Sequence, residues 1–247
     1  MQLVTSARNP VVKQVRKAVA RGGLTDDGLC IAEGFHLLEE ARRSGCEIVT
    51  ILAAESTRCG VQHTTIPDDL FRSIATTENS QGVIALVRPP AWSIDDLFRG
   101  EALVVVLDGI QDPGNAGTII RSAEAFGATG AALLKGSVNP YNPKCIRASA
   151  GSIFRVPLLT PFDEELLYER RIEMYALVPG AEQDIARCPL DHPAALIIGS
   201  EARGVRESLR AKSIPASIPT TGVESLNAAT AAAIALYEAR RQRTANP

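Results

Sequence analysis

The second half of the chain carries a series of short, uniformly apolar segments, and these constrain the fold more than any other feature. Five segments are rich in Val, Ile, Leu or Ala without polar alternation: Ala102–Leu107, Gly130–Leu134, Met174–Val178, Ala194–Ile198 and Ser213–Ile218. Strands of this composition are covered by helices on both faces. Helices are expected at Ala116–Phe126, Glu164–Arg171, Val205–Ala211 and Leu226–Arg241. The pattern predicts an α/β domain with a doubly wound parallel sheet, in which ligands bind beyond the carboxyl ends of the strands.

The first half predicts a second, smaller α/β domain. Helices are expected at Asn9–Ala20 and Phe35–Arg43, and strands beginning at Cys30 and at Ile48–Ala53 and Val83–Val87. The segment Arg88-Pro89-Pro90-Ala91 interrupts this pattern, because adjacent prolines cannot continue a strand ladder. We therefore predict a domain over residues 1–90, a linker or short helix over 91–101 and a second domain over 102–247.

Composition excludes several classes of protein. The N-terminal residues lack the apolar core of a secretory signal, and the longest strongly apolar run, Ala102–Leu107, is too short to span a bilayer. The five cysteines show no C-x-x-C spacing, and the three histidines lie far from any cysteine cluster, so neither a zinc site nor a disulfide framework is expected. We predict a soluble, cytoplasmic protein with no metal and no membrane contact.

The charge distribution is uneven at the N-terminus. The whole chain has 26 basic and 28 acidic side chains, which argues against a general attraction to nucleic acid. From Met1 to Gly23, however, there are five basic residues and no acid. Taken alone, such a run is more typical of a solvated helix face than of a surface that contacts phosphates, although both interpretations stay open.

Three polar, glycine-containing loops follow predicted strands. The loop Asp108–Gly117 leads into a helix that carries Arg121, and it matches neither a dinucleotide fingerprint nor a phosphate loop. The loop Ile198–Gly204 contains Glu201 between two glycines. The loop Ile218–Asn227 places Ser225 where it would cap a helix beginning at Leu226. Taken singly, each loop is more typical of an ordinary turn, helix cap or surface ion pair than of a functional site.

Together, and in this order, the loops resemble the motifs of the SpoU/TrmH family of RNA ribose 2′-O-methyltransferases, within the SPOUT superfamily. The matching segments are Asn115–Arg121, Gly199–Gly204 and Ile218–Asn227, with Asn142–Gly151 as a further match between the first two. The first half, at Glu33–Ala41 and Gln81–Val83, is similar to the N-terminal substrate-binding domain of the ribosomal-RNA branch. The resemblance spans roughly 130 residues of the second half.

The resemblance implies a C-terminal domain with a deep trefoil knot, S-adenosylmethionine as cofactor, and a homodimer formed through the knotted domain. The implied catalytic residues are Arg121, Asn115, Glu201, Ser225 and Asn227, and the implied cofactor-binding residues are Gly199, Ile218, Leu226, Val178 and Pro219. Residues 1–90 would bind RNA, with ribosomal RNA favoured over transfer RNA. The candidate RNA contacts are Arg8, Lys13, Arg16, Lys17, Lys144 and Arg147.

Arg121 is expected to engage the 2′-hydroxyl or its neighbouring phosphate. An arginine does not serve as a free base because its pKa exceeds about 12, so it would stabilise the forming alkoxide or act with a phosphate oxygen. Two departures from the family pattern stand at Ala202, usually glycine, and Ser80, often histidine. The alternatives are an RNA-binding pseudoenzyme and a methyltransferase that acts on a base or a protein.

Overall fold

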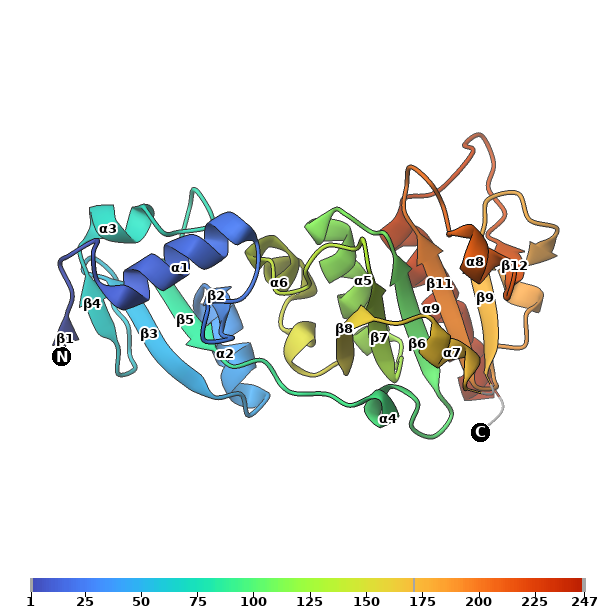
Figure 1. Cartoon of the computed structure of the whole chain (residues 1–247), viewed down its shortest axis with the longest axis horizontal. Helices are drawn as coiled ribbons and strands as arrows, with labels where there is room; N and C mark the ends of the chain where they lie inside the picture. The colour runs from blue at the N-terminus through green and yellow to red at the C-terminus, as the bar shows by residue number, and fades with distance from the viewer. Residues whose placement is uncertain (1, 171, 246–247) are drawn as a thin grey trace. The chain divides into compact units, whose positions relative to one another are not determined.

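The computed structural model describes residues 2–170 and 172–245, which fold into two compact units (Figure 1). The first unit combines the residues up to Ala91 with the segment Asn139–Arg155, and the second combines Trp92–Val138 with the residues from Val156 onward. None of the helices in the described ranges has the length and apolar character that a membrane span requires.

The first unit contains a five-stranded mixed sheet in the order β1-β4-β3-β5-β2. Its strands are Gln2–Leu3 (β1), Cys30–Glu33 (β2), Ile48–Ala54 (β3), Thr64–Ile66 (β4) and Val83–Val87 (β5). Its helices are Pro10–Arg21 (α1), Phe35–Arg43 (α2), Asp68–Arg72 (α3), Pro143–Ser149 (α6) and the 3₁₀ turn Ser152–Phe154 (η1). The predictions for α2 and β5 are therefore confirmed to the residue.

Both faces of this sheet are covered, because successive strand side chains point to opposite sides. In β2, Ile31 packs in one core with residues of α1 and α3. Its neighbours Cys30 and Ala32 pack in another core with α2, α6 and η1. Ile146 and Phe154, from the segment Asn139–Arg155, are buried in this second core. That segment is therefore an integral part of the first unit, although it lies far along the chain.

The second unit contains a seven-stranded sheet in the order β10-β12-β9-β11-β6-β7-β8, and every strand pair is parallel. The strands are Leu103–Asp108 (β6), Gly130–Leu134 (β7), Leu158–Phe162 (β8), Glu173–Leu177 (β9), Gln183–Asp184 (β10), Ala194–Gly199 (β11) and Ile214–Ser217 (β12). The predicted parallel sheet is confirmed. The edge strand β8 was not predicted, since its Thr160-Pro161 pair interrupts the apolar pattern.

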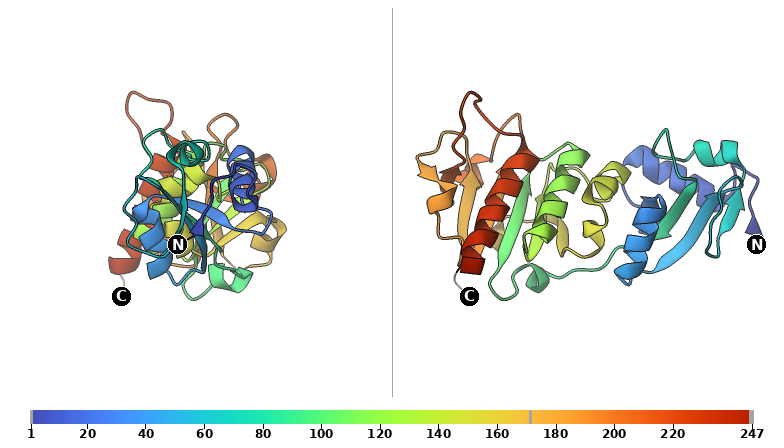
Figure 2. Two further views of the ribbon diagram at one scale, coloured as in Figure 1. Left: turned by 90° about the vertical axis from the view of Figure 1, so that its left-hand side faces the viewer. Right: turned by 180° about the vertical axis from the view of Figure 1, so that it is seen from behind.

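Helices cover both faces of the seven-stranded sheet. They are Ile94–Leu97 (α4), Pro113–Ala125 (α5), Glu165–Tyr168 (α7), Glu207–Arg210 (α8) and Ala228–Ala245 (α9), with the 3₁₀ turn Ile185–Arg187 (η2). Side chains of α4, α7 and α8 share one core with β6, β7, β9 and β11. On the other face α9 packs against α5 and β11, as the view from behind in Figure 2 shows.

Several predicted helix boundaries were wrong, and caps explain the largest differences. Helix α5 begins at Pro113, because Asp112 caps it by accepting a hydrogen bond from the Asn115 N–H at 2.8 Å. Helix α9 begins at Ala228 and not at Leu226. The helices predicted over Glu164–Arg171 and Val205–Ala211 are the shorter α7 and α8; Arg171 lies outside the described residues.

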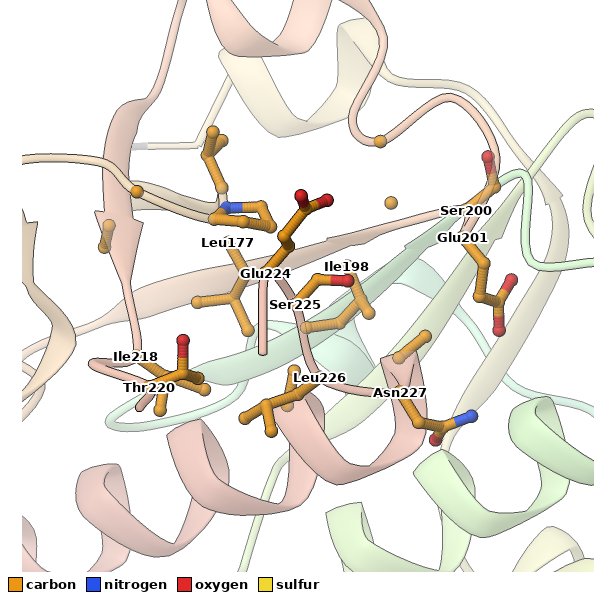
Figure 3. A pocket seen from close by; sticks show the side chains of 18 residues that line it. Leu177, Ile198, Ser200, Glu201, Ile218, Thr220, Glu224, Ser225, Leu226 and Asn227 are labelled. Carbon is orange, nitrogen blue, oxygen red and sulfur yellow. The ribbon is translucent and has the colours of Figure 1, made fainter. Parts of the chain in front are cut away.

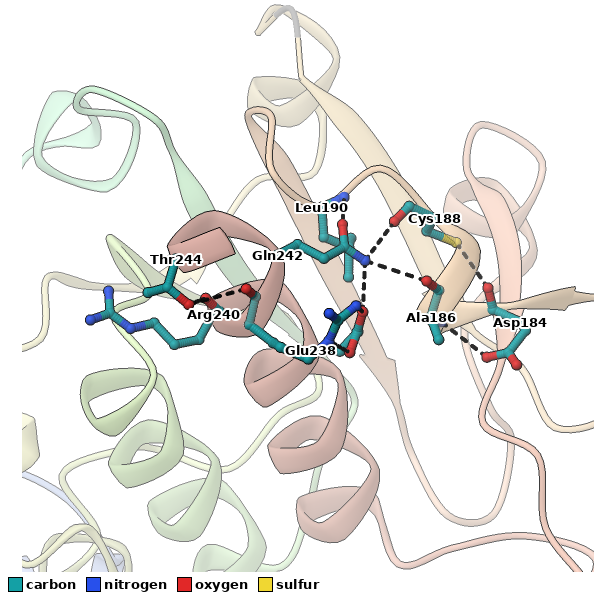
Figure 4. A network of polar contacts seen from close by, with 9 residues as sticks. Asp184, Ala186, Cys188, Leu190, Glu238, Arg240, Gln242 and Thr244 are labelled. Carbon is teal, nitrogen blue, oxygen red and sulfur yellow. Dashed lines mark hydrogen bonds and ion pairs between the residues drawn. The ribbon is translucent and has the colours of Figure 1, made fainter. Parts of the chain in front are cut away.

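The C-terminal end of α9 is fixed to the rest of the second unit by side chains that satisfy backbone groups (Figure 4). The Gln242 carboxamide accepts from the Leu190 N–H at 2.8 Å and donates to the Cys188 carbonyl at 3.1 Å. The Arg243 guanidinium donates to the carbonyls of Leu190 and Ala102, at 2.8 and 3.1 Å. Burial lowers the pKa of Arg243. These bonds fix the position of α9 relative to β6 and β11.

Candidate functional site

The first two glycine-containing loops leave neighbouring strands at the same edge of the seven-stranded sheet. Asp108, the last residue of β6, is in register with Gly199, the last residue of β11. From β6 the chain continues to β7 on one side, and from β11 it continues to β12 on the other. This is a topological switch point, where open parallel sheets bind ligands.

A cavity of about 470 Å³ lies beside the carboxyl end of β11 (Figure 3). It is formed by the residues that follow β9, β11 and β12 and by the first turn of α9. Its apolar lining includes Leu177, Val178, Ile198, Ile218 and Leu226, and its polar lining includes Ser200, Glu201, Thr220, Glu224, Ser225 and Asn227. The second and third predicted loops therefore converge on one pocket.

The loop after β11 folds back on itself so tightly that its first residue must be glycine. A Cβ on Gly199 would lie 2.1 Å from the Gly204 carbonyl carbon. The Gly204 N–H donates to the Ser200 carbonyl at 2.8 Å, which closes the loop. Ala202 is not among the positive-φ residues, so the replacement of the family's usual glycine there requires no left-handed backbone.

Three side chains, one from each predicted loop, form a hydrogen-bonded chain at the side of the pocket. The Asn115 Nδ2 donates to Glu201 Oε1, and the Asn227 Nδ2 donates to Asn115 Oδ1 at 3.1 Å. Asn227 Oδ1 accepts from the N–H groups of Ala229 and Thr230 at 2.9 and 3.2 Å. Asn227 is therefore the cap of α9, and the expectation that Ser225 caps this helix was wrong. An amide with both a donor and an acceptor can cap the helix and bind Asn115 at once.

The first two loops are also joined at their bases. The Arg206 backbone N–H donates to Asp108 Oδ2 at 2.7 Å, and its guanidinium Nε donates to Asp108 Oδ1 at 2.6 Å. The same guanidinium pairs with Glu164 at 3.1 Å. Hydrogen bonds to the buried Asp108 raise the pKa of Arg206. Sequence reasoning missed this pair, because neither residue belongs to a recognisable spacing.

The predicted catalytic residues fall into two groups. Glu201, Ser225 and Asn227 line the pocket, and Asn115 is bonded to two of them. Arg121 is exposed on α5 and is not part of the lining. Six helical positions separate it from Asn115, which corresponds to about 9 Å of rise and about 240° of rotation. The two side chains therefore lie on different faces of α5.

Four of the five predicted cofactor residues, Gly199, Ile218, Leu226 and Val178, line the pocket, whereas Pro219 does not. Glu224 and the residues at the end of β9, notably Leu177 and Gly180, also line it and were not predicted. The β9 residues could have been predicted as pocket residues, because they lie at the carboxyl end of a parallel strand, where such sheets bind ligands.

The residues present fit S-adenosylmethionine. The cavity volume lies within the range of about 300–1,000 Å³ typical of small-molecule sites. Its apolar walls suit an adenine ring, and Glu201 and Glu224 suit a ligand with positive charge. No Lys, Arg or His is among the lining residues. In the described part of the chain, no three His, Cys, Asp or Glu side chains are grouped as metal ligands.

The basic face of α1 is less positive than its sequence suggests. Lys17 and Arg21 both pair with Asp26, at 2.8 and 3.3 Å, and Arg16 donates to Ser73 Oγ at 2.9 Å. Hydrogen bonding to Lys17 lowers the pKa of Asp26. The acidic partner of this face lies beyond Gly23, where the acid-free stretch ends. The chain after α1 folds back onto the helix and so brings this partner against it.

The other candidate RNA contacts are distributed over the first unit. Arg8, Lys13 and Lys144 are exposed. The Arg147 guanidinium is partly buried and donates to Thr76 Oγ1. Arg147 therefore binds within its own unit as well as presenting a charge at the surface.

Both units match families of known proteins. Residues 102–237 match the SpoU rRNA Methylase family, and residues 9–85 match the MRM3-like substrate binding domain. The chain is 34% identical to the 23S rRNA (guanosine(2553)-2′-O)-methyltransferase RlmP of Bacillus subtilis, over 97% of this chain and 100% of that protein. It is also 34% identical to an uncharacterized tRNA/rRNA methyltransferase of Synechocystis, over 98% of this chain and 94% of that protein.

Solved structures agree with these matches. The SpoU methyltransferase AviRb of Streptomyces viridochromogenes, in complex with AdoMet, superposes with a TM-score of 0.85 at 28% identity, over 97% of this chain and 100% of that one. An AdoMet-bound rRNA methyltransferase from Sinorhizobium meliloti gives a TM-score of 0.83 at 28% identity, over 97% of each chain. The chain therefore belongs to the SpoU rRNA Methylase family and is an RNA methyltransferase that uses S-adenosylmethionine.

Proposed function

We propose that this enzyme methylates a ribose 2′-hydroxyl in 23S ribosomal RNA. The observation that carries the proposal is the hydrogen-bonded chain Glu201–Asn115–Asn227, which joins three sequence-distant loops beside the pocket. RlmP of Bacillus subtilis and the uridine methyltransferase of Streptomyces viridochromogenes, the latter 35% identical over 72% of this chain, are both named as 23S rRNA 2′-O-methyltransferases.

The pocket residues have distinct tasks in this reaction. When bound, S-adenosylmethionine supplies an electrophilic methyl group. The backbone at Gly199, Ile218 and Leu226 would hold the cofactor between the apolar walls, with Val178 beside it. Glu201 fixes the Asn115 amide, and Asn115 fixes Asn227, so the polar side of the pocket is ordered before the substrate arrives. Such positioning can contribute ~7–11 kcal/mol to a two-substrate reaction.

Arg121 is proposed to stabilise the 2′-oxygen as it loses its proton, or to bind the neighbouring phosphate. Because Arg121 is exposed and lies outside the lining of its own pocket, we propose that it serves the pocket of a second copy in a homodimer. Ile234 and Tyr237 of α9, the helix that packs against α5, are 37% and 56% exposed and would be covered by such a partner.

The family likeness also suggests the roles of the two parts of the chain, a knot in the second part and the location of the enzyme. We propose that residues 1–90 bind RNA, that residues 102–247 transfer the methyl group, and that the latter contain a deep trefoil knot. The proposal of a knot rests on the likeness of this chain to solved SpoU methyltransferase structures. We also propose that the enzyme works in the cytoplasm, where ribosomal RNA is modified.

The test is methylation of unmodified 23S ribosomal RNA by the wild-type enzyme and by Arg121→Ala and Arg121→Lys. Digestion of the RNA to nucleosides should show 2′-O-methylribose from the wild type only, since a lysine cannot reproduce the planar guanidinium fork. Mixing Arg121→Ala with Asn227→Ala should restore part of the activity, because a mixed dimer contains one intact composite site. A methylated base, near-normal turnover by both Arg121 variants, or no restoration on mixing would contradict the corresponding part of the proposal.

A further inference from the structure

Phe35, in the first unit, is the most exposed phenylalanine in the part of the chain that the structure describes. Its side chain is 38% exposed at the start of α2, whereas Leu37 and Leu38 of the same helix are buried. Aromatic side chains of this kind are used to stack unpaired bases in RNA-binding proteins. The ring is therefore available to a ligand at the surface of the unit that matches a substrate-binding domain.

A glutamine is fixed against the backbone of Phe35. Gln81 Oε1 accepts a hydrogen bond from the Phe35 N–H at 2.9 Å. Gly34 has a φ of +101°, and a Cβ there would lie 3.1 Å from the same oxygen, so glycine allows the close approach. With Oε1 engaged by the backbone, the Nε2 group of this exposed side chain remains as a donor.

The loop that carries Gln81 is held firmly. The buried Glu33 carboxylate accepts from the Thr76 N–H at 2.7 Å and from Thr77 Oγ1 at 2.8 Å. Arg147 donates to Thr76 Oγ1, which places a guanidinium near this end of the loop. At the other end, a Cβ on Gly82 would lie 1.9 Å from Thr57 Oγ1, so the backbone there is tightly packed.

We propose that Phe35 and Gln81 form a binding site for an unpaired base of the RNA substrate. The phenylalanine ring stacks on the base, and Gln81 Nε2 donates a hydrogen bond to an acceptor on the base edge. The ring supplies affinity for any base, whereas the amide favours a base with an acceptor in reach. This inference rests on the proposed function, because it assumes that RNA is the substrate.

The first experiment measures the affinity of Phe35→Ala and Phe35→Trp for unmodified 23S ribosomal RNA transcribed in vitro. Stacking of one base predicts binding about 5- to 150-fold weaker for Phe35→Ala, and near wild-type binding for Phe35→Trp. Val49→Ala is the matched control, since Val49 is another exposed apolar residue of the same unit, at 44%. It should bind RNA as the wild type does.

A second pair of variants tests the amide. Gln81→Glu keeps an oxygen for the Phe35 N–H but loses the donor to the base, so it should weaken RNA binding by about tenfold. Gln62→Glu introduces the same charge at another exposed glutamine of this unit and should have a much smaller effect. In steady-state assays, Phe35→Ala and Gln81→Glu should raise KM for the RNA and leave kcat unchanged.

The result that would overturn the inference is RNA affinity within twofold of Val49→Ala for Phe35→Ala, or equal losses for Gln81→Glu and Gln62→Glu. All four variants should bind S-adenosylmethionine like the wild type, because their positions lie outside the cofactor pocket. A failure of the proposed function is distinguishable from these outcomes, because it would appear in the wild type as an absence of 2′-O-methylation.

Discussion

Asn227 performs two tasks with one side chain. Its Oδ1 caps α9, and its Nδ2 binds Asn115 beside the pocket. Helix stability and the proposed catalytic role are therefore coupled at this residue, and substitutions can separate them because the two tasks use different atoms.

Asn227→Asp should retain the cap and lose the donor to Asn115. We expect unchanged or slightly higher stability, since a negative charge suits a helix N-terminus, together with a loss of methyl transfer of at least tenfold. Asn227→Ala should lose the activity and also about 1 kcal/mol of stability. Thermal unfolding and methyl transfer, measured on both variants, check this; equal stability of the two would contradict the assignment of the cap.

Cys30 shows how burial affects a single ionisable group. Burial raises the pKa of its thiol to about 12, so the folded protein holds the neutral form. The unfolded chain titrates near its ordinary value of about 8.5. The resulting contribution to the free energy of unfolding is complete below the pKa of the thiol in the unfolded chain. It is lost as the pH rises through the pKa of the thiol in the folded protein.

The free energy of unfolding should therefore fall between about pH 9 and pH 12. Cys30→Ala should make this decline shallower but leave a remainder, because burial also raises the pKa of Tyr141 to about 12. Denaturant unfolding at a series of alkaline pH values measures the slopes. Parallel slopes for the wild type and Cys30→Ala would contradict the prediction.

At the scale of helices and strands, the bounds of an element are predicted best where the types of its residues alone determine them. The apolar runs of β5 and β7 and the amphipathic α2 were predicted to the residue, because burial on one or both faces determines each residue type. Sequence patterns failed where a single polar side chain decides a boundary, as Asp112 and Asn227 do for α5 and α9.

For the site, the family motifs located the pocket loops. The Asp108–Arg206 bond was missed because it depends on strand order, which no local pattern specifies.

Helix α9 depends on its C-terminal anchor. Gln242→Ala should remove the bonds to Leu190 and Cys188 and cost about 1–3 kcal/mol, because it leaves partly buried backbone groups unpaired. Arg240→Ala, an exposed position of the same helix, should change stability by no more than about 0.5 kcal/mol. Chemical denaturation compares the two variants, and similar losses for both would contradict a role for the anchor.

Helix α1 offers a test of the proposed RNA contacts. Asp26→Asn should release Lys17 and Arg21 and so tighten RNA binding at low salt, with the gain disappearing at high salt. Asp27→Asn makes the same change in net charge at a residue whose carboxylate binds Gln14. Filter binding at several salt concentrations should show the gain for Asp26→Asn alone. An equal gain for both variants would indicate a general charge effect and not a surface on α1.

At the scale of the whole molecule, the two units are interleaved along the chain. The segment Asn139–Arg155 belongs to the first unit, so the chain passes between the units near residues 91, 138 and 155. Ile146 and Phe154 are at most 2% exposed within the first unit. The first unit therefore cannot be removed by cutting the chain once.

A truncated chain beginning at Trp92 should expose these apolar side chains, bind a hydrophobic dye and aggregate. The same truncation with Asn139–Arg155 replaced by a short Gly/Ser linker should remain soluble and bind S-adenosylmethionine, because all residues of the pocket belong to the second unit. Light scattering, dye fluorescence and calorimetry distinguish the two proteins. Equal solubility without the replacement would contradict the prediction.

The interleaved chain also sets an order for folding during translation. The first unit lacks part of its core until residue 155 has left the ribosome, at which point β6 and β7 have already emerged and β8 to β12 have not. At synthesis rates of about 5–20 residues per second, the two strands wait several seconds for their remaining neighbours. The nascent polypeptide thus completes its first folded unit with an unfinished sheet attached, and the unpaired edges of β6 and β7 are open to pairing with other chains until the remaining strands emerge.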